Sequence, residues 1–292
     1  MKKTSLGGRF FDIFNITFNS VIGILAVLPF VYIVLASFTS TQEFLARRFV
    51  FIPTTFSLDG YRYIFSTDTI LRGLMNSIYL VVVGTFFNLL VTTLLAYPLS
   101  RRELLGRKYL MMFVIFPMIF SGGMIPTYLV VRSLGLLNSL WALILVSLVN
   151  PFFLVIIKNF FQNIPEELVD AARIDGCGEL RIFGRIILPL SKPVLATFLI
   201  FYAVGHWNGF FNAFLYLHDI NLWPVQLWLR QVVIASAGGI GDLSGFAVDF
   251  ITPPTHIVQM GVVVVSTLPI LVIYPFMQRH FVKGVMLGSI KG

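Results

Sequence analysis

Charge is scarce in this chain, and cysteine is almost absent. Only 12% of the 292 residues are charged and 57% are hydrophobic, whereas soluble domains carry about 25% charged residues. The mean hydropathy is +0.88. The single cysteine, Cys177, excludes an intramolecular disulfide and any metal site built from several cysteines. The composition is therefore typical of a membrane protein.

Motifs for catalysis are also missing. The four histidines have no metal-ligand spacing and no Gly-x-Ser-x-Gly nucleophile motif occurs, so we predict neither catalytic residues nor a bound metal. No Walker A motif is present, so this chain does not hydrolyse ATP by that route. A pump built on this chain would need energy from another polypeptide.

Six apolar runs approach or exceed the roughly 20 residues needed to cross the hydrocarbon core. They occupy residues 16–38, 74–99, 109–131, 139–157, 194–217 and 257–278. We therefore expect an all-α polytopic membrane protein, with residues 1–292 forming one transmembrane domain of six spanning helices. The first run could instead be a signal peptide, but it is longer than the usual apolar region of about 7–15 residues.

Basic residues predict the orientation of the spans. With both termini in the cytoplasm, the internal segments hold fifteen Lys and Arg and the external segments hold six. Because cytoplasmic segments are enriched in Lys and Arg, residues 159–193 are expected inside and the loops 39–73 and 218–256 outside. The net charge of +8 then reflects topology, and we expect no binding of nucleic acid.

The two long external loops have different characters. In the first, we expect a short amphipathic piece lying along the membrane surface. The second contains Trp223 and Trp228, which are typical of the membrane–water interface. Its glycine-rich stretch, residues 236–246, lacks the Gly-x-Gly-x-x-Gly spacing of a phosphate loop.

The longest polar interval in the second half of the chain is residues 165–193, which hold five of the thirteen acidic residues. Asn163 is a candidate N-cap, Pro165 suits a first helical turn, and Gly176 is placed to stop the helix in a left-handed turn. One helical face would hold Leu168, Ala171, Ala172 and Asp175, and the two alanines would leave it flat. A second short helix is expected over residues 179–187. From composition alone, a simple connection between two spans explains the segment equally well.

The same segment resembles the EAA loop of ABC importer permeases, whose pattern is Glu-Ala-Ala, two residues, Asp-Gly-Ala, and an apolar stretch ending in Leu-Pro. This chain has Asp170-Ala171-Ala172, Asp175-Gly176-Cys177 and later Leu188-Pro189. Asp170 replaces the usual Glu and Cys177 the usual Ala, which keeps charge or size. The segments LPLSKPVLAT, HWNGFFNAFLYL and FVKGVMLGSIKG extend the likeness to MalG-type sugar permeases, especially those for aldouronate or alginate oligosaccharides.

This resemblance implies a MetI-like, MalG-like permease fold in the bacterial cytoplasmic (inner) membrane. It implies a permease subunit of an ATP-driven importer for oligosaccharides, uronate-containing ones included. The implied partners are a MalF-like second permease, a dimer of cytoplasmic ATPase subunits, an extracytoplasmic solute-binding protein and the bilayer. ATP and Mg would be bound by the ATPase subunits and no cofactor by this chain. The residues expected to couple to the ATPase are Glu166, Asp170, Ala171, Ala172, Asp175, Gly176, Leu188 and Pro189. The resemblance also implies that the tail, residues 278–292, reaches into the ATPase dimer and that the loop before the last span contacts the binding protein.

None of the six apolar runs contains Asp, Glu, Lys or Arg, and this argues against a proton-driven secondary transporter. Their polar residues include Asn76, Asn88, Asn150, Asn208, Asn212 and Gln259. Amides beside aromatic rings suit a sugar, which offers hydroxyls and CH faces. The candidate wall of the substrate pathway is His206, Trp207, Asn208 and Asn212. The same groups could instead make interhelical hydrogen bonds. A secondary transporter, or another polytopic membrane protein working without an ATPase, remains the alternative.

Overall fold

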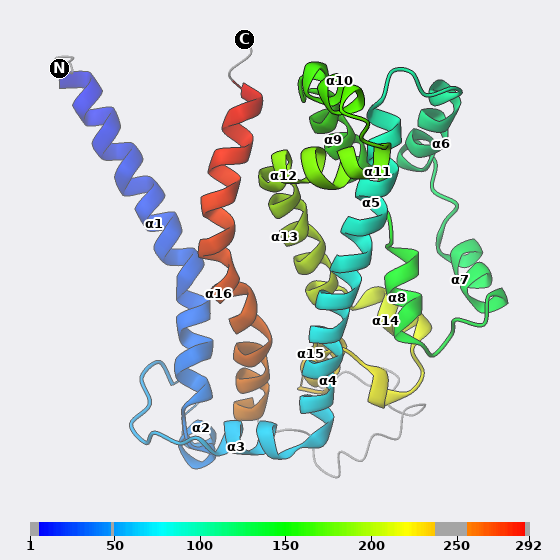
Figure 1. Cartoon of the computed structure of the whole chain (residues 1–292). Coiled ribbons are helices and arrows are strands. Elements are labelled where there is room, and N and C mark those ends of the chain that lie inside the picture. Colours follow the sequence, from blue (N-terminus) through cyan, green and yellow to red (C-terminus); the bar gives the residue numbers. More distant parts are fainter. Residues whose placement is uncertain (1–5, 48–49, 237–255, 290–292) are drawn as a thin grey trace. The chain divides into compact units, whose positions relative to one another are not determined.

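Helices make up the structure, a computed structural model that describes residues 6–47, 50–236 and 256–289 (Figure 1). Within these ranges no β-strand occurs, only an isolated bridge between Thr39 and Phe56. The chain divides into two compact units, residues 1–68 with 229–267 and residues 69–228 with 268–292. The expected all-α class is confirmed for the described part of the chain. The glycine-rich stretch expected in the second external loop lies, from residue 237 onward, outside the described residues.

The first unit is built from α1 (Leu6–Ser37), α2 (Thr41–Ala46), α3 (Asp59–Ser66), the second part of α15 (Val225–Ser236) and the first part of α16 (His256–Ser289). Most side chains of α1 are apolar and exposed, as expected of a helix surrounded by lipid. Its end is tied to α3 by a hydrogen bond of 2.7 Å between the hydroxyls of Ser37 and Tyr61. The short amphipathic piece expected in residues 39–73 is α3, whose Ile64 is buried while Phe65 is exposed.

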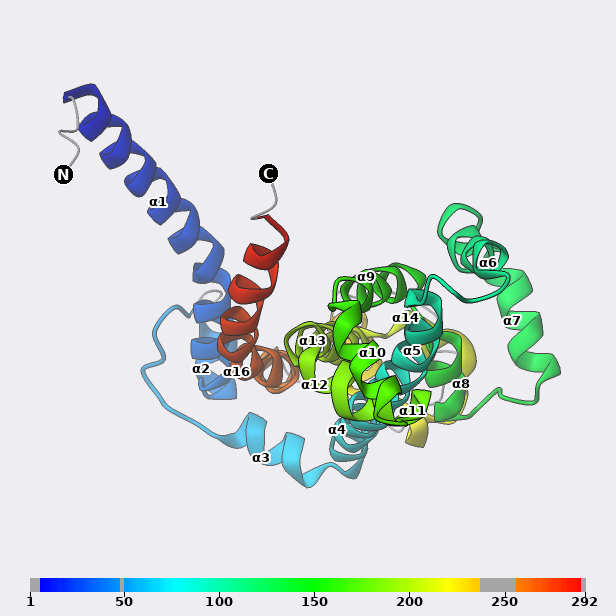
Figure 2. The same ribbon diagram turned by 45° about the horizontal axis from the view of Figure 1, so that its top comes forward.

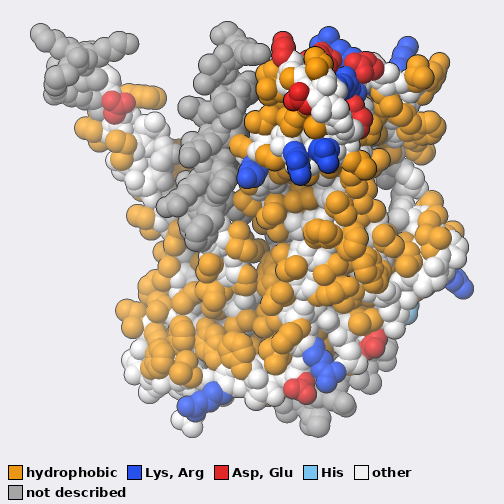
Figure 3. All heavy atoms as spheres, in the orientation of Figure 1, with side chains coloured by type: hydrophobic (Ala, Val, Ile, Leu, Met, Phe, Trp, Pro, Cys, Tyr) orange, Lys and Arg blue, Asp and Glu red, His pale blue; other side chains and the backbone are white. Residues whose placement is uncertain are grey.

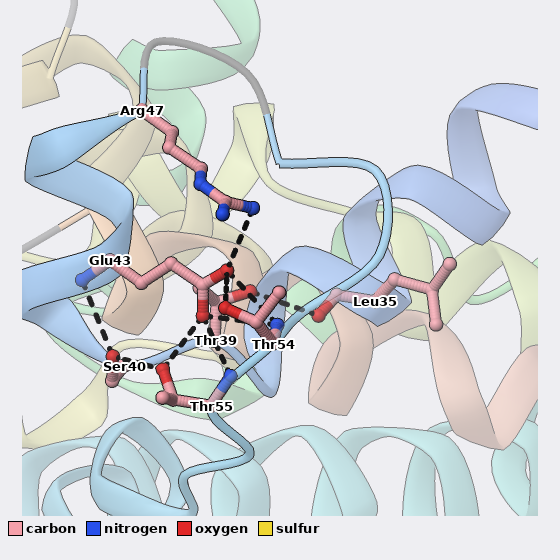
Figure 4. Close-up of polar contacts among 7 residues, drawn as sticks. All are labelled: Leu35, Thr39, Ser40, Glu43, Arg47, Thr54 and Thr55. Carbon is pink, nitrogen blue, oxygen red and sulfur yellow. Dashed lines mark hydrogen bonds and ion pairs between the residues drawn. The ribbon is translucent and has the colours of Figure 1, made fainter.

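A buried carboxylate holds the loop between α2 and α3 in place (Figure 4). Glu43 accepts hydrogen bonds from the backbone N–H groups of Thr54 and Thr55, at 3.0 and 2.8 Å, and from both threonine hydroxyls, at 2.6 and 2.7 Å. These donors, the hydroxyls first, lower the pKa of Glu43 to about 2. The N-cap of α2 joins the same cluster, because the Ser40 hydroxyl bonds the Glu43 N–H and the Thr55 hydroxyl.

The second unit contains a long continuous helix, Asp68–Ser100. It consists of α4 (Asp68–Tyr79), a π-helical turn η1 (Leu80–Gly84) and α5 (Thr85–Ser100). The other helices of this part of the chain are α6 (Arg107–Ile119), α7 (Met124–Ser133), α8 (Leu140–Val146), α9 (Pro151–Gln162), α10 (Glu166–Ile174), α11 (Glu179–Ile182), η2 (Phe183–Ile187), α12 (Leu188–Leu190), α13 (Lys192–Asn208), α14 (Phe211–Tyr216), η3 (Ile220–Leu222) and α15 (Val225–Ser236).

Three of the six expected spans are uninterrupted helices by length and composition, namely Phe10–Ser37, Asp68–Ser100 and His256–Tyr274. The other three are bent pairs: α6 with α7 at 119°, α8 with α9 at 54°, and α11–α12 with α13 at 81°. The described residues therefore give three spans, or up to six if each pair counts as one.

Each of the three breaks has a local cause in the sequence. Gly122 and Gly123 separate α6 from α7, and glycine is a poor helix former. Pro151 begins α9 and Pro193 lies at the start of α13. Proline disfavours a helical conformation at the residue before it. Pro151 therefore interrupts the apolar run 139–157, whereas Pro193 lies just before the run 194–217. Six spans therefore stay a prediction, with the runs 109–131 and 139–157 bent and the run 194–217 divided between α13 and α14.

Trp223 and Trp228, which we expect at the level of the membrane–water interface, are buried among protein side chains, with ring centroids 4.9 Å apart. Nearby polar contacts hold the segment before α15 against α4. The Ser77 hydroxyl accepts a hydrogen bond of 2.9 Å from the Val225 N–H, and the Asn76 amide donates to the Asn221 carbonyl at 2.7 Å. The tryptophans fill the interior of this fold, and their position at the membrane–water interface stays a prediction.

Candidate functional site

The segment that resembles an EAA loop begins its helix later than the sequence predicts. Asn163 ends α9 rather than capping α10, and its backbone N–H bonds the carbonyls of Asn159 and Phe160 at 3.2 and 3.1 Å. The N-cap of α10 is Pro165, without a side-chain cap. Glu166 and Glu167 in the first turn place negative charge near the positive end of the helix dipole.

The predicted left-handed stop at Gly176 is confirmed, with a φ of 75°. The Cys177 N–H bonds the Ala172 carbonyl at 2.9 Å, and the Gly176 N–H bonds the Arg173 carbonyl at 3.0 Å. These two bonds form a Schellman motif, which satisfies the last carbonyls of α10. The predicted second helix is also present, beginning at Glu179 in α11 and continuing through η2 and α12 to Leu190.

The two alanines of the motif do not share an exposed face. Ala171 is exposed, whereas Ala172 is buried together with Val169. The predicted flat face formed by both alanines is therefore wrong, because the side chains three residues apart at 169 and 172 turn inward. The exposed side of α10 presents Ala171, with Leu168 and Ile174 nearby in the sequence.

One hydrophobic cluster holds this segment against the helices beneath it. Val169 and Ala172 of α10, together with residues of α11 and η2, belong to the same buried cluster as residues of α5, α9 and α13. Figure 2 shows α10, α11 and α12 lying over the ends of α5, α9 and α13. Leu188 and Cys177 pack against the edge of this cluster. Movement of α10 is therefore coupled mechanically to these longer helices.

The outer surface of the segment combines apolar and acidic groups. Ile174 is 87% exposed and Leu180 is 81% exposed, which is unusual for large apolar residues outside the lipid-facing part of such a chain. Glu166, Asp170, Asp175 and Pro189 are exposed as well. In the space-filling view, charged side chains gather over α10 and α11 while hydrophobic ones cover the helices below (Figure 3). Such a surface suits a protein partner, which can bury the apolar residues and pair with the acids.

A polar network links the segment to α5. The Tyr97 hydroxyl donates to Glu179 at 2.6 Å, and Arg173 donates to the other oxygen of that carboxylate at 3.0 and 3.1 Å. Arg173 also lies 3.5 Å from both Glu103 and Asp170. The Tyr97 hydroxyl and then Arg173 lower the pKa of Glu179, and the bond to Glu179 raises the pKa of Arg173. Glu179 therefore stays ionised at neutral pH.

A cavity of about 420 Å³ lies where α8 and α9 meet α13, and its lining is partly polar. Of the four residues predicted to line the pathway, His206 and Asn212 line this cavity. Trp207 is buried away from it, and Asn208 is exposed and does not line it. Asn150 and Tyr202, which we did not predict as pathway residues, do line it. Asn150 had a signal in the sequence, because it is an amide directly before Pro151 in an apolar run.

Asn88 does not line this cavity but forms hydrogen bonds with residues that do. Its side-chain amide donates to the carbonyls of Ser147 and Leu148, at 2.6 and 2.8 Å, and its oxygen lies 2.6 Å from Nε2 of His206. Because carbonyls can only accept, the amide nitrogen must face them. The Asn88 oxygen then faces His206, whose Nε2 must carry the proton. The interhelical role considered for His206 is thus present alongside its position in the cavity.

The π-helical turn η1 also contacts His206. A Cβ atom added to Gly84 would lie 2.5 Å from Nε2 of His206, so only glycine allows this close approach. The cavity holds no described Lys, Arg, Asp or Glu. No group of three or more His, Cys, Asp or Glu that could hold a metal ion occurs within the described ranges. The arrangement can therefore bind a neutral polar group or pass one, but it offers no charged catalytic pair.

Comparisons with known proteins agree on one family. The sequence model of the family described as "Binding-protein-dependent transport system inner membrane component" matches residues 88–286. The polygalacturonan/rhamnogalacturonan transport system permease protein YtcP of Bacillus subtilis is 52% identical over 97% of this chain and 99% of the relative. Protein LplC of Bacillus subtilis is 53% identical over 98% of this chain and 96% of the relative.

A solved structure has the same fold. It belongs to a bacterial ABC transporter involved in the import of the acidic polysaccharide alginate. The match has a TM-score of 0.87 and 27% sequence identity, and it covers 96% of this chain and 100% of the other.

Proposed function

Because this chain belongs to the family of binding-protein-dependent transport system inner membrane components, we propose that it is the membrane subunit through which an ATP-driven importer passes oligosaccharides. The chain itself would form half of the translocation pathway. A second, related permease would supply the other half, and a dimer of cytoplasmic ATPase subunits with bound ATP and Mg would supply the energy. An extracytoplasmic binding protein would deliver the sugar.

The observation that carries this proposal is the surface of α10 and α11. It exposes Ile174 and Leu180 beside several acids, yet its inner side belongs to the same hydrophobic cluster as α5, α9 and α13. A partner that binds this surface can therefore push on the long helices as a rigid body. We assign the coupling role to Glu166, Asp170, Ala171, Asp175, Gly176, Leu188 and Pro189, with Ala172 acting from inside as a packing residue.

The membrane topology is part of the proposal. Each bent helix pair would count as one span, which gives six in the bacterial cytoplasmic membrane, with both termini in the cytoplasm. Non-helical backbone at membrane depth is tolerated where neighbouring groups satisfy its polar atoms. Asn88 does this at the α8–α9 break, where it bonds two carbonyls. The excess of basic residues in the cytoplasmic segments supports the orientation.

For the substrate, we propose an oligosaccharide that contains uronate units, since the structural relative imports an acidic polysaccharide. The cavity residues of this chain are neutral: Asn150, Tyr202, His206 and Asn212 offer hydrogen bonds to hydroxyl groups, and Phe153 and Phe201 offer faces for stacking. No described cation lines the cavity. The carboxylates of the sugar would therefore be met by the partner permease or by water.

An Ala171→Phe variant tests the docking surface. Ala171 is exposed, so the larger side chain fits without disturbing the buried cluster, but it blocks close approach of a partner. The full chain is purified from membranes together with its partners, and ATPase activity and sugar uptake in liposomes are measured. We expect vanadate-sensitive ATPase activity to co-purify with the wild type. The variant should retain about one tenth of that activity or less, since one misplaced interface side chain lowers the binding free energy by about 1.4 kcal/mol or more.

The matched control is Leu134→Phe, which changes a residue that is 65% exposed, in the turn between α7 and α8 and away from α10 (Figure 1). This variant should keep the ATPase. Uptake by the chain alone that is insensitive to vanadate would instead identify a secondary transporter. Full ATPase retention by Ala171→Phe would place the partner elsewhere on the chain.

A further inference from the structure

The network around Tyr97 joins three helices that otherwise meet through apolar contacts. Tyr97 lies near the end of α5, Arg173 near the end of α10 and Glu179 at the start of α11. Both oxygens of the Glu179 carboxylate are used, one by the Tyr97 hydroxyl at 2.6 Å and one by Arg173 at 3.0 Å. Among the described residues, the Tyr97–Glu179 bond is the only hydrogen bond between α5 and the segment 163–190.

The ion pairs in this network are too exposed to explain it by stability. The side chain of Arg173 is 32% exposed, that of Glu179 is 53% exposed and that of Glu103 is 65% exposed. Such pairs contribute about 0–1 kcal/mol each, which is small beside the hydrophobic cluster below. The position of the pair matters more than its energy. Arg173 precedes the turn at Gly176 and Glu179 follows it, so the ion pair spans the turn.

Tyr97 is held much more firmly than its partners. It is 9% exposed, its ring packs against Phe183 with centroids 5.1 Å apart, and the Arg101 guanidinium lies 4.7 Å above the ring centroid. Because these contacts already fix the ring, forming the hydrogen bond to Glu179 costs little side-chain entropy. A shift of α5 therefore moves the Tyr97 hydroxyl and, through its hydrogen bond to Glu179, the turn between α10 and α11.

We propose that Tyr97, Glu179 and Arg173 form a force-transmitting bridge, through which displacement of α10 by the ATPase is passed to α5. This inference rests on the proposed function, and it adds positioning residues that lie outside the docking surface itself. The hydrophobic cluster packs these helices together, and the short charge-assisted bond adds a directional restraint at one point of contact. The bridge would make α10, α11 and the end of α5 move as one body.

The test is Tyr97→Phe, which removes only the hydroxyl and keeps the ring, in the complete importer reconstituted with its ATPase and binding protein. The measured quantity is the amount of sugar imported per ATP hydrolysed, together with co-purification of the ATPase. We expect co-purification and ATP hydrolysis to stay within about twofold of the wild type while import per ATP falls about tenfold, the loss expected for one charge-assisted hydrogen bond. Tyr109→Phe is the control, because Tyr109 is 70% exposed on α6 and its hydroxyl makes no hydrogen bond among the described residues.

A double variant separates a bridge from unrelated local effects. If the hydroxyl and the carboxylate act as one unit, Tyr97→Phe combined with Glu179→Gln should lower import per ATP no further than the stronger single variant. Additive losses would overturn the bridge, as would unchanged import per ATP in Tyr97→Phe. Failure of Tyr97→Phe to assemble would also overturn it, since the bond would then serve folding. If the wild-type complex itself contained no ATPase, the proposed function would fail instead, and this outcome is distinguishable.

Discussion

Replacing Asn88 by Leu removes the amide that supports the α8–α9 break and keeps the branching of the side chain at Cγ, with two methyl groups that are larger than the amide N and O. Asn88 is completely buried. Its amide nitrogen serves the carbonyls of Ser147 and Leu148, and its oxygen serves His206. Because both carbonyls lie at a helix break, no residue further along the helix can replace the lost donor. The variant therefore leaves the Ser147 and Leu148 carbonyls without this donor and the His206 ring N–H without its acceptor.

The expected cost follows from these three contacts. A buried acceptor left without a donor costs about 1–3 kcal/mol in soluble proteins, but interhelical hydrogen bonds in membranes contribute only about 0.6 kcal/mol on average and about 2 at most. Three such contacts give roughly 2–4 kcal/mol of lost stability when the membrane values are weighted more strongly. Local opening at the break should also alter the cavity lined by His206 and Asn150.

Unfolding of the purified chain by a denaturing detergent, followed by circular dichroism, measures this cost. The control is Thr93→Val on the same helix, which is isosteric and removes a hydroxyl that bonds only the carbonyls of Leu89 and Leu90 within α5. Such local bonds contribute little, so we expect the control to change stability by less than about 0.5 kcal/mol. An Asn88→Leu variant as stable as this control would refute the structural role that we assign to the amide.

Two other changes probe close packing and charge. Gly84→Ala should destabilise the chain by about 1–3 kcal/mol, because its Cβ would lie 2.5 Å from the His206 ring, whereas Gly205→Ala has nothing within 4 Å and should be neutral in the same unfolding assay. The pKa of Glu43 is lowered to about 2. The stabilisation by the ionised carboxylate is therefore complete above the ordinary pKa range of a carboxyl group, and it is lost only as the pH falls towards the lowered pKa. Hydrogen–deuterium exchange at the Thr54 and Thr55 amides should therefore stay slow, relative to the intrinsic rate, through pH 4.5. Loss of protection already at that pH would contradict the bonding in Figure 4.

The features that were predictable from the sequence depend on short-range signals. Gly176 ends α10 because glycine accepts a left-handed backbone, and the second short helix begins at Glu179 as predicted. Long apolar runs also predicted the three uninterrupted helices. Hydropathy is insensitive to backbone direction, however, so it missed the breaks near Gly123 and Pro151, which lie inside two of the runs.

The predictions that were wrong concern features that tertiary contacts determine, namely helix ends and the side of a helix that is buried. Asn163 is a good N-cap by type, but α9 extends to Gln162 and uses Asn163 as its C-cap. Ala172 turns inward because Val169 and Ala172 are the pair of α10 that meets the hydrophobic cluster. No periodicity in the local sequence encodes these choices, whereas the side-chain chemistry at each position is compatible with either outcome.

The coupling surface and the cavity are connected through a single helix, α5. Tyr97 near its end bonds the segment that carries α10, and Asn88 bonds the α8–α9 break and His206. These two residues lie nine positions apart, about 14 Å along a helix. A helix of this length bends little under load, so displacement at Tyr97 must appear at Asn88, unless Pro98 at the end of α5 yields first. Pro98 has no N–H to bond the Leu94 carbonyl, so the last turn of α5 is the place where the helix could bend. Ala96 and Tyr97 of this turn belong to the buried hydrophobic cluster, and that packing opposes the bend. Movement of α10 should therefore reach the cavity as a shift of α5 against α9 and α13. Loss of the Tyr97 contact or of the Asn88 contacts is then expected to uncouple ATP hydrolysis from import. Of the two changes, only the loss of the Asn88 contacts should also destabilise the fold.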